Sequence, residues 1–477
     1  MFFSSFDAEI AILRSAHIGN LTDLERAIGS NRPLFIQDFS YDINNPYQAV
    51  KHKLLKANGH MDVANLGTLS AQYGLQINQR QEFDIRRAGR STIPALSLDL
   101  YTHTVDLDLD MAPMGNWKWD VGSSFMYQNN ENDPETGIRP LIPDFENWTA
   151  GAHVISRYIQ PNYELEAGAR YDFRHYLIKR FDENNNLLKP EFSFNNLTGS
   201  IGALFFLSND FQLRTNLGTA WRAPHVNELY SEGLHHGAAA VEEGNDQLKS
   251  EKSVKWITSL EKNTQKLGLN ISVYANLITD YIYLRPEDVT LTIRGAFPIF
   301  RYRQTDALLT GIDTDLKYQI SERLENKSKL SIIYAQDQRL KSPLINIPAN
   351  SLSTGFEYDL GIKGFMNSYI GLEATYTDRQ RNSPRVVSIA DIQNANDLNT
   401  DLFQSDASVF DILDVPAAYG LINIDAGLEK EMRDSILKFN LAVTNLLNTE
   451  YRDYFNRFRY YSAEMGRNIT LRISYEF

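Results

Sequence analysis

Three histidines lie close together in one polar segment of the chain, and two acidic residues follow them. They are His225, His235 and His236, followed by Glu242 and Glu243. The chain of 477 residues has nine histidines, so an even distribution would place less than one of them in a segment this short. Imidazole and carboxylate groups together suit zinc, copper or nickel, and imidazole also ligates haem iron. The segment is therefore a candidate ligand-binding site, with His235 and His236 as candidate metal ligands.

Two other interpretations of these residues stay open. In the first, the histidines are solvated loop residues, and Glu228 pairs with Arg222 near the rim of the fold. In the second, the loop binds a polar ligand that contains no metal. None of the three interpretations needs a resident cofactor, and the sequence predicts none.

The rest of the composition argues against most other chemistry. The chain has no cysteine, which rules out thiolate metal sites, cysteine nucleophiles and disulfides. Its formal charge of −13, with no basic stripe, argues against nucleic acid as a partner. No nucleophile-elbow, phosphate-loop or HExxH motif is present, so an enzyme is not expected. The segment 182–187 begins like a calcium loop, but Leu187 stands where that loop needs glycine, so we interpret it as solvated.

The elements that must position the histidines are predicted by alternating apolar and polar side chains. From Ile469 to Phe477 every second residue is apolar, and the residues between them are polar or charged. Successive side chains of a strand point to opposite faces, so such a strand has one apolar and one polar face. The same alternation occurs in 69–78, 312–320, 422–429 and 437–444.

The connections between the predicted strands, about 18 in number, alternate between short and long. Short links include 111–116 and 160–162, and long ones include 12–48, 222–249 and 379–418. Short turns at one rim and long loops at the other are typical of outer-membrane barrels, and so are aromatic residues near strand ends, such as Trp117 and Tyr158. The predicted fold is all-β: a transmembrane antiparallel β-barrel with the topology of an up-and-down meander.

Two segments resemble the β-barrel of TonB-dependent outer-membrane receptors. The first, 219–253, is similar to a strand-to-loop motif of that family in Arg222, Pro224, Glu228, Gly244 and Asn245. The second, 440–477, is similar to the closing hairpin of the family in Asn445, Asn448, Tyr451, Gly466, Arg467 and the terminal Phe477. Weaker similarity extends over nearly the whole chain.

The resemblance implies a receptor in the outer membrane of a Gram-negative bacterium, surrounded by membrane lipid. Such a receptor imports a scarce extracellular ligand: a metal ion, a metal chelate such as a siderophore, or haem. The TonB system supplies the energy. Haem importers of the family place a ligating histidine between two sequence boxes; 221–224 matches the first box, whereas 244–248 departs from the second. The segment 233–237 also resembles zinc-type members of the family.

Members of the family also carry a signal peptide, a TonB-binding segment and a plug before a barrel of about 22 strands. Barrel-like sequence begins here at once, with FFSSFDAEIAIL. We therefore expect 1–477 to be an outer-membrane barrel domain truncated at its N-terminus, without plug or signal peptide, that functions poorly alone and contacts TonB only through the missing region. Alternatively, the strand count is low and only the plug is separate.

Two other functions fit the same strand pattern. A passive outer-membrane porin would show ligand flux without an energised inner membrane. A soluble, surface carbohydrate-binding β-protein would partition into water rather than into detergent.

Overall fold

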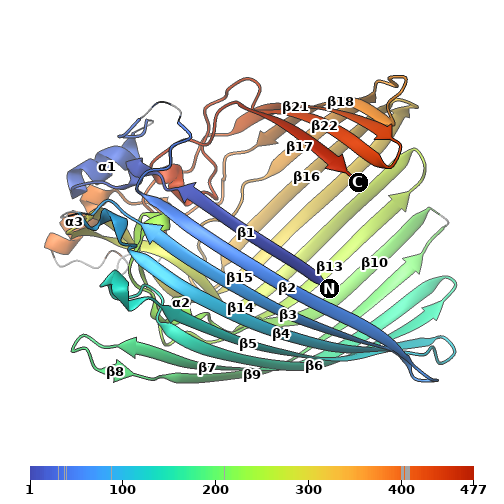
Figure 1. Ribbon diagram of the computed structural model, residues 1–477, viewed down its shortest axis with the longest axis horizontal. Coiled ribbons are helices and arrows are strands. Elements are labelled where there is room, and N and C mark those ends of the chain that lie inside the picture. Colours follow the sequence, from blue (N-terminus) through green and yellow to red (C-terminus); the bar gives the residue numbers. More distant parts are fainter. Residues whose placement is uncertain are drawn as a thin grey trace.

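The fold is a single curled sheet, seen in a computed structural model that describes residues 1–30, 32–36, 38, 40–86, 89–208, 210–398, 402 and 409–477. Within those residues, 21 strands form this one sheet. Three of them, β8 (Leu187–Leu188), β11 (Glu232–His235) and β12 (Ala240–Glu243), are short additions. The other eighteen follow one another as an antiparallel meander that curls into a barrel wall (Figure 1). The predicted all-β, up-and-down fold of about 18 strands is confirmed.

The strands of the wall are long, and most of them have ten residues or more. They are β1 (Phe2–Ala11), β2 (Tyr47–Val63), β3 (Gly67–Phe83), β4 (Leu96–Met111), β5 (Trp117–Asn132), β6 (Asp144–Gln160), β7 (Tyr163–Phe181), β9 (Glu191–Phe206), β10 (Phe211–Arg222), β13 (Glu251–Asn263), β14 (Leu267–Thr292), β15 (Gly295–Ser321), β16 (Leu324–Asp337), β17 (Ser351–Asp359), β18 (Asn367–Thr377), β21 (Tyr419–Met432), β22 (Ser435–Thr444) and β23 (Asn468–Glu476).

The remaining elements lie in the connections between these strands. They include the helices α1 (Leu21–Gly29), α2 (Val226–Tyr230) and α3 (Ile389–Asp397), the paired strands β19 (Arg385–Val386) and β20 (Phe410–Asp411), and, within the described ranges, five short 3-10 helices. In the described part of the chain, no helix is both long enough and apolar enough to cross a membrane.

The alternating pattern sets the two faces of the wall. On β23, for example, Ile469, Leu471 and Ile473 share the outer face and are 60–66% exposed. A lipid bilayer would cover such a face, because outer-membrane barrels turn their apolar residues outward and their polar residues inward. Aromatic side chains gather at the rim of the short turns, as predicted: the ring of Trp117 lies 4.9 Å from that of Tyr158, which lies 6.4 Å from the ring of Tyr163.

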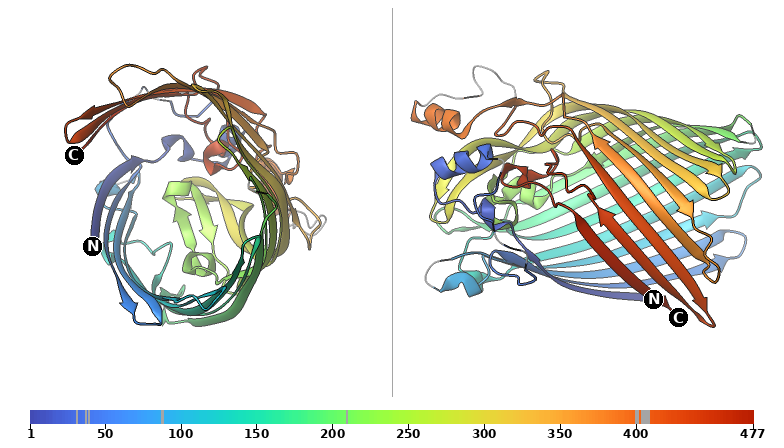
Figure 2. Two further views of the ribbon diagram at one scale, coloured as in Figure 1. Left: turned by 90° about the vertical axis from the view of Figure 1, so that its right-hand side faces the viewer. Right: turned by 90° about the horizontal axis from the view of Figure 1, so that it is seen from above.

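The two ends of the barrel differ. Strands β4 and β5, β6 and β7, and β21 and β22 are joined by short turns at one end, and the long connections gather at the other (Figures 1 and 2). Among the described residues, no ladder joins β1 to β23.

The long connections pack against one another around a buried apolar cluster, which we call the loop cap. Four connections contribute to it, those between β1 and β2, β10 and β13, β18 and β21, and β22 and β23, together with the far end of the β14–β15 hairpin. Its buried members include Leu24, Ile28, Ala240, Phe300, Ile392, Phe410 and Tyr460. These loops therefore have a core of their own, unlike independently solvated loops.

Strands β14 and β15 form the longest hairpin, and its far end belongs to the loop cap. Residues Phe297 and Phe300 near this end are completely or almost completely buried. Strand β12 pairs with β15 in parallel, with Val241 opposite Ile299. The end view in Figure 2 shows these green-to-yellow segments inside the ring of strands. The hairpin thus extends the wall and then turns into the mouth of the barrel.

Candidate functional site

The first family-like motif anchors the connection that carries the three histidines. Arg222 ends β10 and donates to Glu228 through Nη1 and to Glu251 through Nε, both at 2.7 Å. Glu228 lies in α2 and Glu251 begins β13. One guanidinium therefore ties the connection to both strands that it joins, and the predicted pairing of Arg222 with Glu228 is present.

Three further motif residues shape the same connection. Pro224 is buried just before α2. The backbone N–H of Asn245 donates to the carbonyl of Glu228 at 2.8 Å. Gly244 packs so closely that a Cβ atom there would lie 2.5 Å from the backbone nitrogen of Tyr230. Only glycine fits at that distance, and all three residues help to position the loop.

The three predicted histidines are separated by this geometry. The backbone N–H of His225 donates to Glu228 at 2.7 Å, at the exposed start of α2. His235 ends β11, whereas His236 begins the next turn of helix, so the two neighbouring side chains contact different groups. Among the described residues, the three do not form a group whose ligand atoms could share one metal ion.

His235 faces a buried carboxylate. Its Nδ1 lies 3.1 Å from Glu242 Oε1, and Arg457 donates to the same oxygen at 3.1 Å. Burial would raise the pKa of Glu242, but His235 and Arg457 outweigh that effect and hold the pKa below its usual value. Glu243 is bound by Arg301 at 2.6 Å. Both predicted acidic residues are therefore engaged by arginines from distant parts of the chain, Glu242 by Arg457 in the β22–β23 connection and Glu243 by Arg301 in β15.

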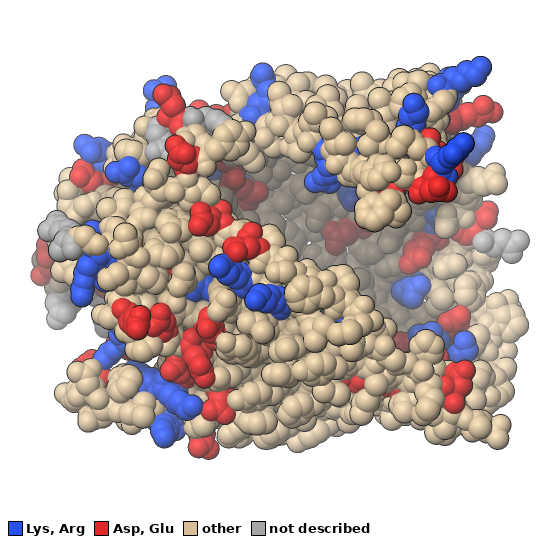
Figure 3. Space-filling view, in the orientation of Figure 1, with Lys and Arg blue, Asp and Glu red and all other residues tan. Residues whose placement is uncertain are grey.

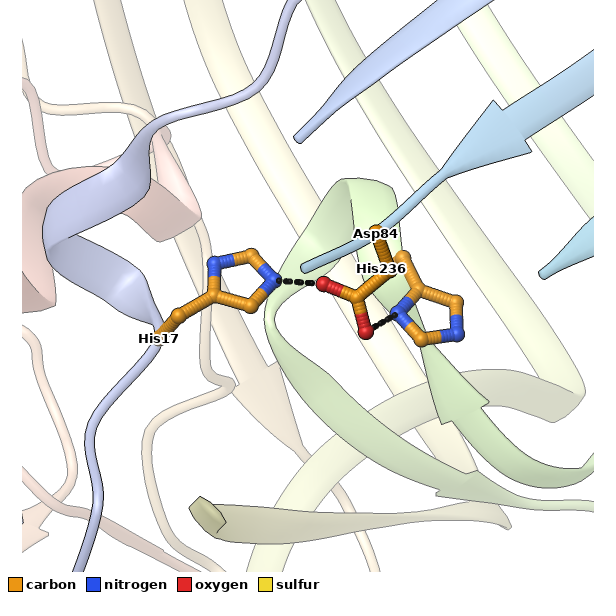
Figure 4. A group of neighbouring side chains, drawn as sticks. All are labelled: His17, Asp84 and His236. Atoms are coloured by element: carbon orange, nitrogen blue, oxygen red, sulfur yellow. Dashed lines mark ion pairs between the residues drawn. The ribbon is translucent and has the colours of Figure 1, made fainter. Parts of the chain in front are cut away.

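His236 belongs to a cluster that the sequence did not reveal, which we call the Asp84 hub. It consists of His17, Asp84 and His236, from three different connections (Figure 4). His17 Nε2 lies 3.2 Å from Asp84 Oδ1, and His236 Nδ1 lies 3.1 Å from Asp84 Oδ2. The side chains are 10%, 1% and 2% exposed, respectively. Neither contact is an aligned hydrogen bond, so the attraction is chiefly electrostatic.

Arg294 determines which ring nitrogen of His236 carries the proton. Nη1 of Arg294 lies 2.6 Å from Nε2 of His236. A guanidinium can only donate, so Nε2 accepts, and the neutral ring carries its proton on Nδ1, which faces Asp84. A metal ion at Nδ1 would move that proton to Nε2, against Arg294. This arrangement is therefore better explained as a buried carboxylate shared by two imidazoles than as a metal centre.

The electrostatics of Asp84 agree with this assignment. Burial alone would raise its pKa, because a charged carboxylate loses its hydration. The imidazoles of His17 and His236 more than offset this effect and hold the pKa of Asp84 well below its ordinary range. The hub thus keeps a charged carboxylate under the loop cap and links the connections that follow β1, β3 and β10.

A cavity of about 400 Å³ lies beside the hub. It reaches His236 and Glu243, two of the residues predicted from the sequence, and its lining is both charged and apolar. Its lining includes Arg139, Glu232, Leu234, His236, Glu243, Arg294 and Ile299. The volume and the mixture of charges suit a small polar ligand.

The second family-like motif shapes the connection before β23. Asn445 and Asn448 adopt positive φ angles of 49° and 56°, and Asn448 Oδ1 accepts from the backbone of Arg467 at 2.9 Å. A Cβ on Gly466 would lie 2.6 Å from that same oxygen. Tyr451 packs on Tyr419 at 4.4 Å between ring centroids. Phe477 ends the chain beside Tyr475, with 6.1 Å between the rings. This motif, too, organises a turn.

Comparison with solved structures shows the same fold in metal-transport proteins. The chain matches the copper transporter OprC with a TM-score of 0.69 and 16% identity, over 90% of this chain and 66% of that one. It matches the FrpB iron transporter from Neisseria meningitidis (F5-1 variant) with a TM-score of 0.66 and 14% identity, over 99% and 69% of the two chains. For the siderophore receptor PiuA from Acinetobacter baumannii, the TM-score is 0.66 and the identity 11%, over 99% and 71%.

The chain thus spans about two thirds of the length of OprC. These relatives are receptors and transporters, in line with the prediction that the chain is not an enzyme. No curated protein sequence matches it significantly. The sequence model of the family described as "TonB dependent receptor-like, beta-barrel" matches residues 14–446. Because this match covers most of the chain, the protein belongs to the TonB-dependent receptors and contains their β-barrel.

Proposed function

We propose that the protein takes part in the energy-coupled import of a metal ion, a metal chelate or haem through the outer membrane of a Gram-negative bacterium. The observation that carries the proposal is the loop cap, in which four long connections and the end of the β14–β15 hairpin share one buried apolar core at the mouth of a barrel of the TonB-dependent receptor family. Membrane lipid would cover the outer face of the wall, and TonB would supply the energy.

The loop cap distinguishes this function from passive diffusion. A porin needs a mouth that stays open to water. Here the β11–β12 hairpin and the ends of β14 and β15 lie inside the ring of strands. A ligand that passes this point must displace packed side chains, and an energy-coupled receptor can drive such a rearrangement.

The ligand class follows from the donor groups of the loop cap. Of the two neighbouring histidines, His235 is the better candidate ligand: its side chain is 27% exposed, whereas His236 is buried and committed to Asp84 and Arg294. Glu242, Glu243 and the exposed His225 complete the candidate set. Three solved relatives carry titles that name copper, iron or a siderophore, which supports a metal-containing ligand.

Uptake measured in energised and de-energised cells tests the proposal. Cells that produce the native protein should accumulate radiolabelled copper, zinc, iron chelate or haem faster than cells that lack its gene, and a protonophore or loss of TonB should abolish the difference. Flux that persists in de-energised cells would instead support a passive porin. Recovery of the protein in the aqueous phase of a detergent partition would support a soluble carbohydrate-binding protein.

A second experiment tests the histidines. Calorimetric titration of zinc and of haemin into the purified protein should give weaker binding for His235→Ala than for the unaltered protein. His175→Gln, on β7, is the matched control. Equal binding of both ligands by all three proteins would rule out the proposed role of His235. The proposed N-terminal truncation of a larger barrel is tested separately, by translating the DNA directly upstream.

A further inference from the structure

A second histidine–carboxylate cluster lies on the inner face of the barrel wall, away from the loop cap. Asp108 on β4, Asp120 on β5 and His153 on β6 form this cluster, which we call the wall site. His153 Nε2 lies 2.8 Å from Asp120 Oδ1 and 3.8 Å from Asp108 Oδ1. The neighbouring residues Val121 and Val154 are exposed on the outer, apolar face, so the three polar side chains point into the barrel.

A glycine makes room for the cluster. Gly122 lies directly between the two outer strands of the group, opposite Asp108 on one side and His153 on the other. A Cβ atom on Gly122 would lie 2.2 Å from Asp108 Oδ1 and 2.4 Å from His153 Cε1. Any other residue would push these two side chains apart. The convergence of imidazole and carboxylate groups therefore depends on the absence of a side chain at this one position.

The charge balance favours a divalent cation. Two carboxylates carry two negative charges, and a neutral imidazole completes a donor set that suits zinc, copper or nickel better than calcium or magnesium. Arg170 lies directly opposite His153 in the register of β6 and β7. Arg170 donates to Asp172 at 2.8 Å and to Ser124 at 2.7 Å, so its positive charge is already paired with the carboxylate of Asp172.

The site is also accessible to an ion from the interior. The side chains of Asp108, Asp120 and His153 are 44%, 38% and 19% exposed. Water can complete the coordination of an ion there, and the ion would not lose its whole hydration shell. Figure 3 looks into the hollow of the barrel and shows acidic and basic side chains on its visible wall.

We propose that Asp108, Asp120 and His153 bind a divalent transition-metal ion of the zinc, copper or nickel class on the inner wall of the barrel. The proposal goes beyond the import function, because it assigns a metal site to the wall and not to the loops. His153 presents Nε2 to the ion and carries its own proton on Nδ1, while each aspartate supplies one oxygen. The position near the short turn that joins β4 to β5 is a second point of contact for an ion that has passed the loop cap.

Titration of zinc chloride and of copper sulfate into the purified full chain in detergent tests the proposal. We expect one ion per chain at the wall site, and a loss of affinity of about tenfold or more in Asp120→Asn and His153→Gln. Gly122→Val keeps every ligand but fills the space between them, so it should lose affinity to the same extent. The controls His52→Gln and Asp313→Asn alter inward-facing strand residues outside the cluster and should bind as the unaltered protein does.

A separate measurement identifies which side chain coordinates the metal ion. Electron paramagnetic resonance of bound copper should show coupling to one imidazole nitrogen, and His153→Gln should remove it. Heat-dependent gel migration checks that each variant is folded. Binding that is unchanged in Asp120→Asn, His153→Gln and Gly122→Val but lost in His235→Ala would overturn the proposal and assign the metal to the loops. Absence of any binding would also overturn it. These measurements need no energised membrane, so they are independent of the uptake experiment.

Discussion

Replacing Asp84 by asparagine removes one charge from the centre of the Asp84 hub and changes its shape very little. The amide can still accept at one oxygen, but its NH2 group then faces the other imidazole. His17 and His236 lose the carboxylate that they share at 3.2 and 3.1 Å. Both rings are nearly inaccessible to water, so solvent cannot replace the lost partner. The connections after β1, β3 and β10 should therefore separate more easily.

The magnitude follows from the type of contact. A hydrogen bond to a charged group contributes about 1.5–3 kcal/mol. The two contacts of Asp84 are close but not aligned, so we expect the lower part of that range, about 2 kcal/mol for the substitution as a whole. A change of that size raises the fraction of open loop about 30-fold. The wall of the barrel should keep its stability, because none of its ladders involves the Asp84 side chain.

Hydrogen exchange of the folded protein in detergent measures this opening directly. In Asp84→Asn, amides of the connections that contain His17, Asp84 and His236 should exchange about 30 times faster, by the conversion used above. The control Asp246→Asn alters an exposed carboxylate in the β10–β13 connection and should leave exchange unchanged. Rates in Asp84→Asn within about threefold of those in the unaltered protein would refute the reasoning. A uniform increase along all strands would show that the substitution acts on the whole barrel instead.

Three further substitutions test other parts of the loop cap. Gly244→Ala places a Cβ 2.5 Å from the backbone of Tyr230, which side-chain rotation cannot relieve, and we expect a loss of about 1–3 kcal/mol of local stability, seen as faster proteolysis within 223–250. Glu242→Gln should weaken the cap at neutral pH, because the pKa of Glu242 is depressed in the fold. The stability that the charged carboxylate contributes is therefore present above the unfolded pKa of about 4.3 and is lost as the pH falls through the folded pKa. The hydrogen-exchange rates of the variant and of the unaltered protein should accordingly converge in acid. Arg459→Met leaves the buried Asp411 without its ionic partner, so we expect a loss of about 3–5 kcal/mol in chemical denaturation, whereas Arg381→Met, at an exposed pair, should cost less than about 1 kcal/mol.

The wall of the barrel could be predicted from the sequence because its signal is local. Each strand alternates apolar and polar residues with period two, and β23 shows this from Ile469 to Tyr475 without any distant contact. The end of the β14–β15 hairpin has no such alternation: Ala296, Phe297 and Phe300 are all buried. That run of apolar residues was the available signal that both faces of this segment are covered, as happens inside the mouth of the barrel.

The Asp84 hub and the wall site could not be predicted, because each depends on which separate connections or strands come to lie beside one another. His17 and His236 are more than two hundred residues apart, and only the closure of the loops over the mouth brings both to Asp84. In the wall site, the three ligands lie on consecutive strands, so the register of two hairpins determines which residues face one another. Gly122 was the available signal, as a glycine within a strand often marks close approach of other groups.

The two histidine–carboxylate clusters contain the same residue types, yet their surroundings assign them opposite roles. At the Asp84 hub there is one buried carboxylate, and its negative charge is offset by the positive charge of Arg294, which contacts the other side of the His236 ring. A divalent ion there would add two more positive charges to a site with almost no access to water. At the wall site, Asp108 and Asp120 supply two negative charges, and water reaches His153 from the interior. Because ion binding depends on net charge and on the cost of dehydration, the hub holds the loops together and the wall site takes the metal.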